Sequence, residues 1–415
     1  MALGEGQVIT SRLNAAALKT SGTTMKLTSS LSSSVSSGLL ALTISLVGGA
    51  AANPASAQGR PDQIYVLDTR SGKIDMLAGV VQEHGLEKTV IVRSGKERSY
   101  DSSRIERIVW GDVLGSFREG RTYFDRGDYE NAAAKFLVAA TDDLRTPVQA
   151  ASRLLAAQSF LNLSMKQPDR ISDAIEQARR YMDDYADGAG LPQARAMHAR
   201  AKWLAGEAAE AAALFDAIFQ EASAGDITLG YKRTPCLRAG LSAARAYLAA
   251  GETLPARETY LKLRQRAESG IAALEEGSKE HAELHKLSLE ARAGEGFTLT
   301  AGKQGKQAIT FFESQLRSAK KTDSALRYAS LLGLGEAFLA ENRVREAQIK
   351  FAQVSSLDHT DRDRVARALF RLAESTESLA DPNSTGTVKA WLNTIVNEYG
   401  DTLWANPARK SLETM

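Results

Sequence analysis

The stretch G-D-Y-E-N-A-A-A-K-F, Gly127 to Phe136, decides the fold because its pattern returns three more times along the chain. Gly206 to Phe215 reads G-E-A-A-E-A-A-A-L-F, Gly251 to Tyr260 reads G-E-T-L-P-A-R-E-T-Y, and Asn342 to Phe351 reads N-R-V-R-E-A-Q-I-K-F. Each copy starts with Gly or Asn, has Ala at its sixth position and ends on an aromatic residue. Recurrence of this kind predicts a repeat architecture.

Two further landmarks precede each copy at fixed distances. Four residues earlier stands a large residue, and three residues before that a small one; the large residues are Tyr123, Lys202, Tyr247 and Phe338, and the small ones Gly120, Ala199, Ala244 and Gly335. Small and aromatic residues at fixed offsets around a turn let two helices approach closely. This order resembles the tetratricopeptide repeat (TPR), a helix–turn–helix unit.

The resemblance covers residues 113–415 and implies a mainly α fold, an α-solenoid of about six or seven helical hairpins. Helices this short are marginal alone, so stacking must stabilise them. The spacing between copies implies about 40 residues per unit, longer than the roughly 34 of the family. A HEAT-like or other α-solenoid therefore stays open as the alternative.

Residues 60–112 differ in composition and predict a small β unit. Short runs rich in Val, Ile and Tyr are separated by turn signals, among them Ser94-Gly95, which predicts a hairpin. Four or five strands in this length suit a small barrel or a bent sheet, and the order of the runs resembles SH3-like or Sm-like barrels, whose long second strand passes through a Gly such as Gly79. Two roles stay open: a cap over the first helices, or a separate ligand-binding module.

Residues 1–57 predict a signal peptide. They contain three basic residues and one acid, an apolar run at 38–52 and an A-x-A site at Ala55-Ser56-Ala57. The run is short for a bilayer span, so we expect no integral membrane segment after cleavage. An organellar transit peptide is the alternative. We expect an exported protein, in the periplasm or associated with the cell envelope.

The bulk composition excludes several classes of function. The 415 residues are 43% hydrophobic and carry a net charge of +2, and the basic excess lies in the leader, so no global field recruits nucleic acid or anionic lipid. Cys236 is the single cysteine, which excludes an internal disulfide.

Two short segments resemble catalytic motifs but do not match them. His281 and His285 lack the glutamate of a zinc-protease motif, and the Gly302–Lys306 segment lacks phosphate-loop spacing. We expect no enzyme, no cofactor and no metal site.

The family register selects candidate partner-binding residues. In TPR units the first helix lines the concave groove, and the positions flanking its landmark aromatic face that groove. The candidates combine arginines with apolar neighbours: Arg121, Phe124, Arg200, Trp203, Arg245 and Leu248. Arg292 lies outside these register positions and extends the stripe. Such a stripe is suited to clamping carboxylates of an extended peptide.

The sequence thus predicts a non-enzymatic scaffold that binds a protein or peptide partner through the groove of the array, with envelope assembly as one setting. The alternative is a ligand-sensing protein whose β unit binds glycan or peptide while the helices form a stalk.

Overall fold

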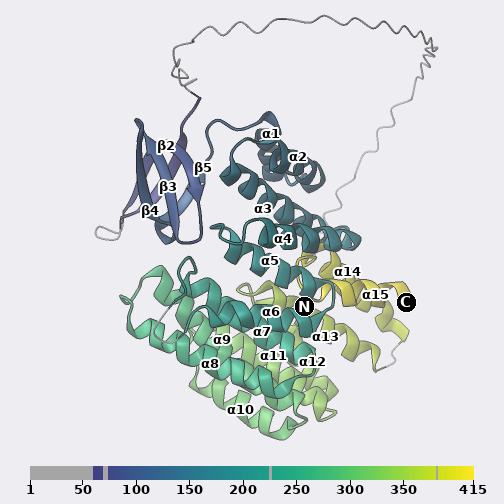
Figure 1. Cartoon of the computed structure of the whole chain (residues 1–415). Coiled ribbons are helices and arrows are strands. Elements are labelled where there is room, and N and C mark those ends of the chain that lie inside the picture. The colour runs from purple at the N-terminus through teal and green to yellow at the C-terminus, as the bar shows by residue number, and fades with distance from the viewer. Residues whose placement is uncertain (1–58, 69–72, 224–226, 380–381) are drawn as a thin grey trace, which may run out of the picture. The chain divides into compact units, whose positions relative to one another are not determined.

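Helices dominate the computed structural model, which describes residues 59–68, 73–223, 227–379 and 382–415 (Figure 1). The predicted signal peptide, residues 1–57, lies outside the described residues. A small antiparallel sheet comes first and a long series of helices follows it. The expected fold class, a mainly α solenoid preceded by a small bent sheet, is confirmed.

The sheet contains five strands in the order β4-β3-β2-β1-β5. Their bounds are β1 Asp62–Leu67, β2 Ile74–His84, β3 Lys88–Arg93, β4 Lys96–Asp101 and β5 Ile105–Val109. The hairpin expected at Ser94-Gly95 joins β3 to β4, and both of its residues have positive φ, 51° and 72°. Two such residues in a two-residue loop match the right-handed twist of the flanking strands.

Strand β2 is the long strand that the sequence predicts, and it changes partner at Gly79. Its first half, Ile74 to Gly79, pairs with β1, and its second half pairs with β3. A Cβ on Gly79 would lie 2.8 Å from the carbonyl oxygen of Val92 and 2.7 Å from Ile91 Cγ2. Only a residue without a side chain allows this close approach. The bend lets Ile64, Val81 and Ile91 form the core of the sheet.

The helices form seven antiparallel hairpins followed by one more helix, all within the described residues. The hairpins are α1 Gly115–Asp125 with α2 Tyr129–Asp142, α3 Thr146–Leu163 with α4 Ile171–Asp184, α5 Leu191–Leu204 with α6 Ala208–Gln220, α7 Arg233–Ala249 with α8 Thr253–Ala272, α9 Lys279–Ala301 with α10 Gly305–Ser318, α11 Ser324–Ala340 with α12 Val344–Leu357, and α13 Arg362–Glu377 with α14 Thr385–Glu398. Helix α15, Ala405–Thr414, ends the series. Each helix packs mainly on its neighbours in the chain, which is the arrangement of a solenoid.

The Gly or Asn that opens each sequence copy closes the first helix of a hairpin. Gly127, Gly206, Gly251 and Asn342 all have positive φ, between 58° and 89°. A residue in this left-handed conformation ends a helix because its amide satisfies a free carbonyl of the last turn. Lys303 takes the same role between α9 and α10, where residues 302–304 form the turn and Gly305 begins α10.

The small and aromatic landmarks meet face to face inside the hairpins. A Cβ on Gly335 of α11 would lie 2.4 Å from Cε1 of Phe351 on α12, and one on Gly120 would lie 2.8 Å from the ring of Phe136. The alanine at the sixth position of each copy is fully buried. The predicted close approach of paired helices along these small and aromatic residues, here called the seam of each hairpin, is therefore confirmed.

The sheet and the helices, as far as the structure describes them from residue 59 onward, pack together within one unit. The carboxylate of Asp62, fully buried in β1, accepts hydrogen bonds from the amides of Val81 (2.9 Å) and Gly111 (2.7 Å) and from Arg145 Nη1 (2.9 Å), just before α3. The amide of Leu86 donates to the carbonyl of Asp187, between α4 and α5. The sheet thus contacts more than the first hairpin.

His84 lies where the sheet meets the α4–α5 connection, and we expect it to make stability depend on pH. Its Nδ1 is 2.8 Å from Thr89 Oγ1, its carbonyl accepts from the amide of Ala189, and burial lowers its pKa to about 4. The unfolded chain therefore binds more protons between pH 4 and 6.5, so stability falls as the pH falls through this window. Lowering the pH from 7 to 5 should cost about 2 kcal/mol through this group.

Urea unfolding of His84→Gln across this pH range measures the effect. The variant should lose the part of the slope of unfolding free energy against pH that His84 causes. His359→Gln, at an exposed position between α12 and α13, should keep it. An unchanged slope in His84→Gln would contradict the prediction.

Candidate functional site

The C-terminal segment returns to the first half of the helical series. Arg200 Nη2 donates to the carbonyl of Asp401 at 3.0 Å, Asn406 Nδ2 to that of Leu204 at 2.7 Å, and Arg409 Nη2 to that of Met165 at 2.6 Å. The turn before α15 and α15 itself therefore lie against α5 and the α3–α4 turn. Contacts between residues about 200 positions apart close the inner side of the intervening hairpins.

A cavity of about 530 Å³ lies on this inner side. Its lining comes mainly from the first helices of successive hairpins, α5, α7, α9, α11 and α13, and from the turn before α15. The apolar lining includes Trp203, Leu248, Phe297, Leu332, Leu339 and Trp404. The volume falls within the range of small-molecule pockets, about 300–1,000 Å³. The described lining residues include no His, Cys or Ser.

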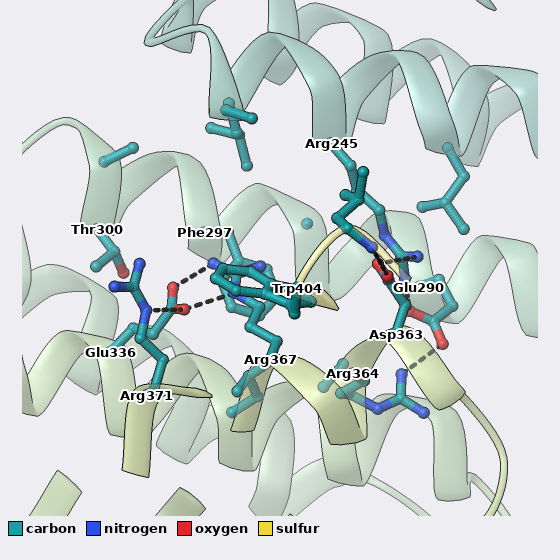
Figure 2. A pocket seen from close by; sticks show the side chains of 18 of the residues that line it. Arg245, Glu290, Phe297, Thr300, Glu336, Asp363, Arg364, Arg367, Arg371 and Trp404 are labelled. Atoms are coloured by element: carbon teal, nitrogen blue, oxygen red, sulfur yellow. Dashed lines mark hydrogen bonds and ion pairs between the residues drawn. The ribbon is translucent and has the colours of Figure 1, made fainter. Parts of the chain in front are cut away.

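One end of the cavity is bounded by an ion cluster around two arginines. Arg364 donates to Glu290 Oε1 at 2.6 Å and to Asp358 Oδ2 at 2.5 Å, and the three side chains are at most 4% exposed. Arg245 Nη2 lies 3.2 Å from Glu290 (Figure 2). It also lies 3.1 Å from Asp361. Burial without such partners would be very costly, so each charge depends on the others.

The other end holds a second cluster. Arg367 Nε donates to Glu336 Oε1 at 2.6 Å, and Arg371 Nε lies 3.5 Å from the same oxygen. The guanidinium groups of Arg367 and Arg371 lie 5.7 Å and 5.6 Å from the centre of the Trp404 ring, and Figure 2 shows this ring between the two clusters. An arginine beside an indole in this range is a cation–π contact.

The electrostatic environments of the carboxylates differ. Burial acts to raise the pKa of Asp361, but the charges of Arg245 and Arg364 outweigh it and hold that pKa well below its usual value. Burial likewise opposes ionisation of Glu336, and Arg367 and Arg371 reverse the effect, so its pKa is lowered. For Asp363 burial prevails over Arg245, and its pKa is raised. Neighbouring arginines therefore compensate the burial of Asp363 less than that of Glu336.

The structure distributes the predicted groove residues unevenly. Trp203, Arg245 and Leu248 line the cavity, and Arg200 holds Asp401 nearby. The guanidinium of Arg245 is occupied by carboxylates of its own chain. The remaining three lie elsewhere: exposed Arg121 pairs with Asp125 and lies over the ring of Phe124, and half-buried Arg292 lies on α9 beside Glu295.

The family register does not select the charged residues that α13 contributes to the cavity. It considers only positions beside a landmark aromatic, and α13 contributes Asp363, Arg367 and Arg371 from other positions. Their four-residue spacing is visible in the sequence and places them on one helix face. That spacing is the signal that could have identified them. Nothing local marks Trp404, which reaches the cavity only because the C-terminal segment returns.

Comparison with known proteins adds no identification: no family model matches the chain, and no curated protein matches it. Among the described helices, none combines the length and apolarity that a membrane span requires.

Proposed function

We propose that this chain is an exported, non-enzymatic scaffold protein of the TPR type, which binds a protein or peptide partner on the inner side of its helical array. The observation that carries the proposal is the convergence of five successive first helices on one cavity with arginines, carboxylates and aromatic rings. Inner faces of helical repeats offer extended concave surfaces for partners. Arginine and tryptophan are also the residues that contribute most often to binding hot spots.

Export is part of the proposal and rests on the leader sequence. The mature chain should begin at Gln58, after the A-x-A site. The intact mass of the protein recovered from the cell envelope tests this directly, and a mass that retains residues 1–57 would contradict it.

Photo-crosslinking tests the binding surface. A benzophenone amino acid replaces Leu248 or Leu339 in the cavity, and as a control Leu254, an exposed residue of the outer helix α8. We expect discrete crosslinked adducts in the native envelope from the two cavity positions and none from Leu254. Equal yields at all three positions would overturn the proposal.

The same experiment examines the alternative function. The sheet exposes apolar side chains on β2 and β5, namely Ile74, Met76 and Val109, each more than 40% exposed. An exposed apolar face is an observation that favours ligand binding by the β unit. A benzophenone at Met76 that crosslinks while Leu248 and Leu339 do not would support that alternative.

A further inference from the structure

Helix α13 presents opposite charges in a row along one wall of the cavity. Asp363, Arg367 and Arg371 follow one another at intervals of four residues, and all three line the cavity. With a rise of 1.5 Å per residue, Arg367 lies about 6 Å and Arg371 about 12 Å from Asp363 along the helix axis. Helix α13 therefore presents a carboxylate at one end of this wall and two guanidinium groups at the other.

These charges retain binding capacity. Asp363 accepts the amide of Leu403 at 3.3 Å, and its nearest guanidinium nitrogen, on Arg245, is 4.0 Å away. Arg367 donates from Nε and Nη2 to Glu336. Arg371 donates from Nε to Glu336 and from Nη1 to Glu374. Within the described residues, Arg367 Nη1 and Arg371 Nη2 donate to no acceptor. All three side chains are between 24% and 34% exposed.

Apolar surface lies between the two ends. Phe297 of α9 lies 4.8 Å from the guanidinium of Arg367, and Trp404 lies beside both arginines (Figure 2). Leu332 and Leu339 of α11 also line the cavity. A ligand that spans the row therefore needs a charged group at each end and an apolar body.

We propose that the cavity binds a short peptide with free termini, whose ammonium group meets Asp363, whose carboxylate meets Arg367 and Arg371, and whose apolar side chains lie against Phe297 and Trp404. Three extended residues span at most about 11 Å, which matches the row of charges. Zwitterions such as ω-amino acids share the end groups. This inference rests on the proposed function, since it specifies which peptides the inner side of the array accepts.

The environment of Asp363 favours a cationic ligand group. Burial raises the pKa of this carboxylate because its compensation within the chain is incomplete. A ligand ammonium supplies a charge-assisted hydrogen bond at this point. A carboxylate at the arginine end can accept two parallel N–H bonds, which fixes its orientation.

Calorimetry of the mature protein with the tripeptide Ala-Leu-Ala tests the inference. The free peptide should bind, and the N-acetyl and C-amide forms should each bind at least about tenfold more weakly, since each lacks one charge-assisted contact. 8-Aminooctanoate serves as the second arm: weaker binding than the tripeptide identifies a peptide site, and stronger binding overturns the peptide assignment. Equal affinity of the free and capped peptides, or no binding at millimolar concentration, overturns the proposal.

Two substitutions test which end of the cavity binds the amino terminus of the peptide and which binds its carboxyl terminus. Asp363→Asn keeps the acceptor for Leu403 but removes the charge, so free and N-acetyl peptides should bind this variant equally. Arg371→Gln removes one of the two arginines that meet the ligand carboxylate, so it should reduce the difference in affinity between the free and C-amide peptides, which Arg367 alone then maintains. The matched controls Asp173→Asn and Arg317→Gln change helix residues outside the cavity, whose side chains are 41% and 71% exposed, and should bind like the wild type.

Crosslinking and calorimetry together distinguish a failure of the peptide proposal from a failure of the proposed function. Crosslinks from Leu248 and Leu339 without tripeptide binding would leave the scaffold in place and overturn the ligand class. Tripeptide binding without crosslinks would support the ligand class and overturn the protein-binding scaffold.

Discussion

Replacing Arg364 with methionine is expected to lower the free energy of unfolding by about 3–5 kcal/mol. The guanidinium is 3% exposed and bonds Glu290 of α9 and Asp358 at the end of α12, which are themselves buried. Methionine preserves much of the packing but leaves two carboxylates without their main partner. The loss of stability comes from uncompensated buried charge. It should affect the interface between the hairpins α9–α10, α11–α12 and α13–α14.

Urea unfolding at pH 7 measures this loss. Arg362→Met is the matched control: Arg362 lies two residues away on the same helix and pairs with Asp401, but its side chain is 59% exposed. An exposed pair contributes at most about 1 kcal/mol. Equal losses in the two variants would show that the buried cluster does not depend on Arg364.

A double variant separates lost charge compensation from lost packing. Glu290→Gln in the Arg364→Met background removes one of the two carboxylates that have lost their main partner, so it should recover part of the stability. In the wild-type background the same substitution should be destabilising, because it weakens the contacts of both Arg245 and Arg364. A loss of the same size in both backgrounds would argue against charge as the cause.

The hairpins could be predicted because their determinants are local. Gly127, Gly206, Gly251 and Asn342 fix the turn by their own backbone conformation, and the seam residues stand at constant distances from them. The fifth unit shows the limit of such reasoning. Its turn residue is Lys303, which has a positive φ without being Gly or Asn, so the pattern in the sequence is weakest where the structure is still regular.

The cavity could be predicted only in part. The register placed Trp203, Arg245 and Leu248 on the inner side, where the structure has them, because inner positions follow from helix periodicity. It could not show that Arg245 meets Asp361, or that Trp404 reaches the same space. Those contacts depend on how small rotations between successive hairpins add up over about 200 residues, and no local pattern encodes that sum.

The seam between α11 and α12 gives the second large expected effect. Phe351→Ala should lower the free energy of unfolding by about 3–5 kcal/mol, since the ring is fully buried and its removal leaves a cavity. Ile349→Ala on the same helix is the control, because Ile349 is 57% exposed and should cost much less. Similar losses at the two positions would contradict the assignment of Phe351 to the seam.

A substitution at Gly335 tests the contact between this residue and the ring of Phe351 directly. In the wild-type protein Gly335→Ala should cost about 1–3 kcal/mol, because the new Cβ would lie 2.4 Å from Cε1 of Phe351. In the Phe351→Ala background that clash is gone, and alanine is the better helix former by about 0.5–1 kcal/mol. The same substitution should then stabilise the protein. This change of sign, read from four urea unfolding curves, is expected only if the two residues meet, and a loss of equal size in both backgrounds would show that glycine is required at position 335 for another reason.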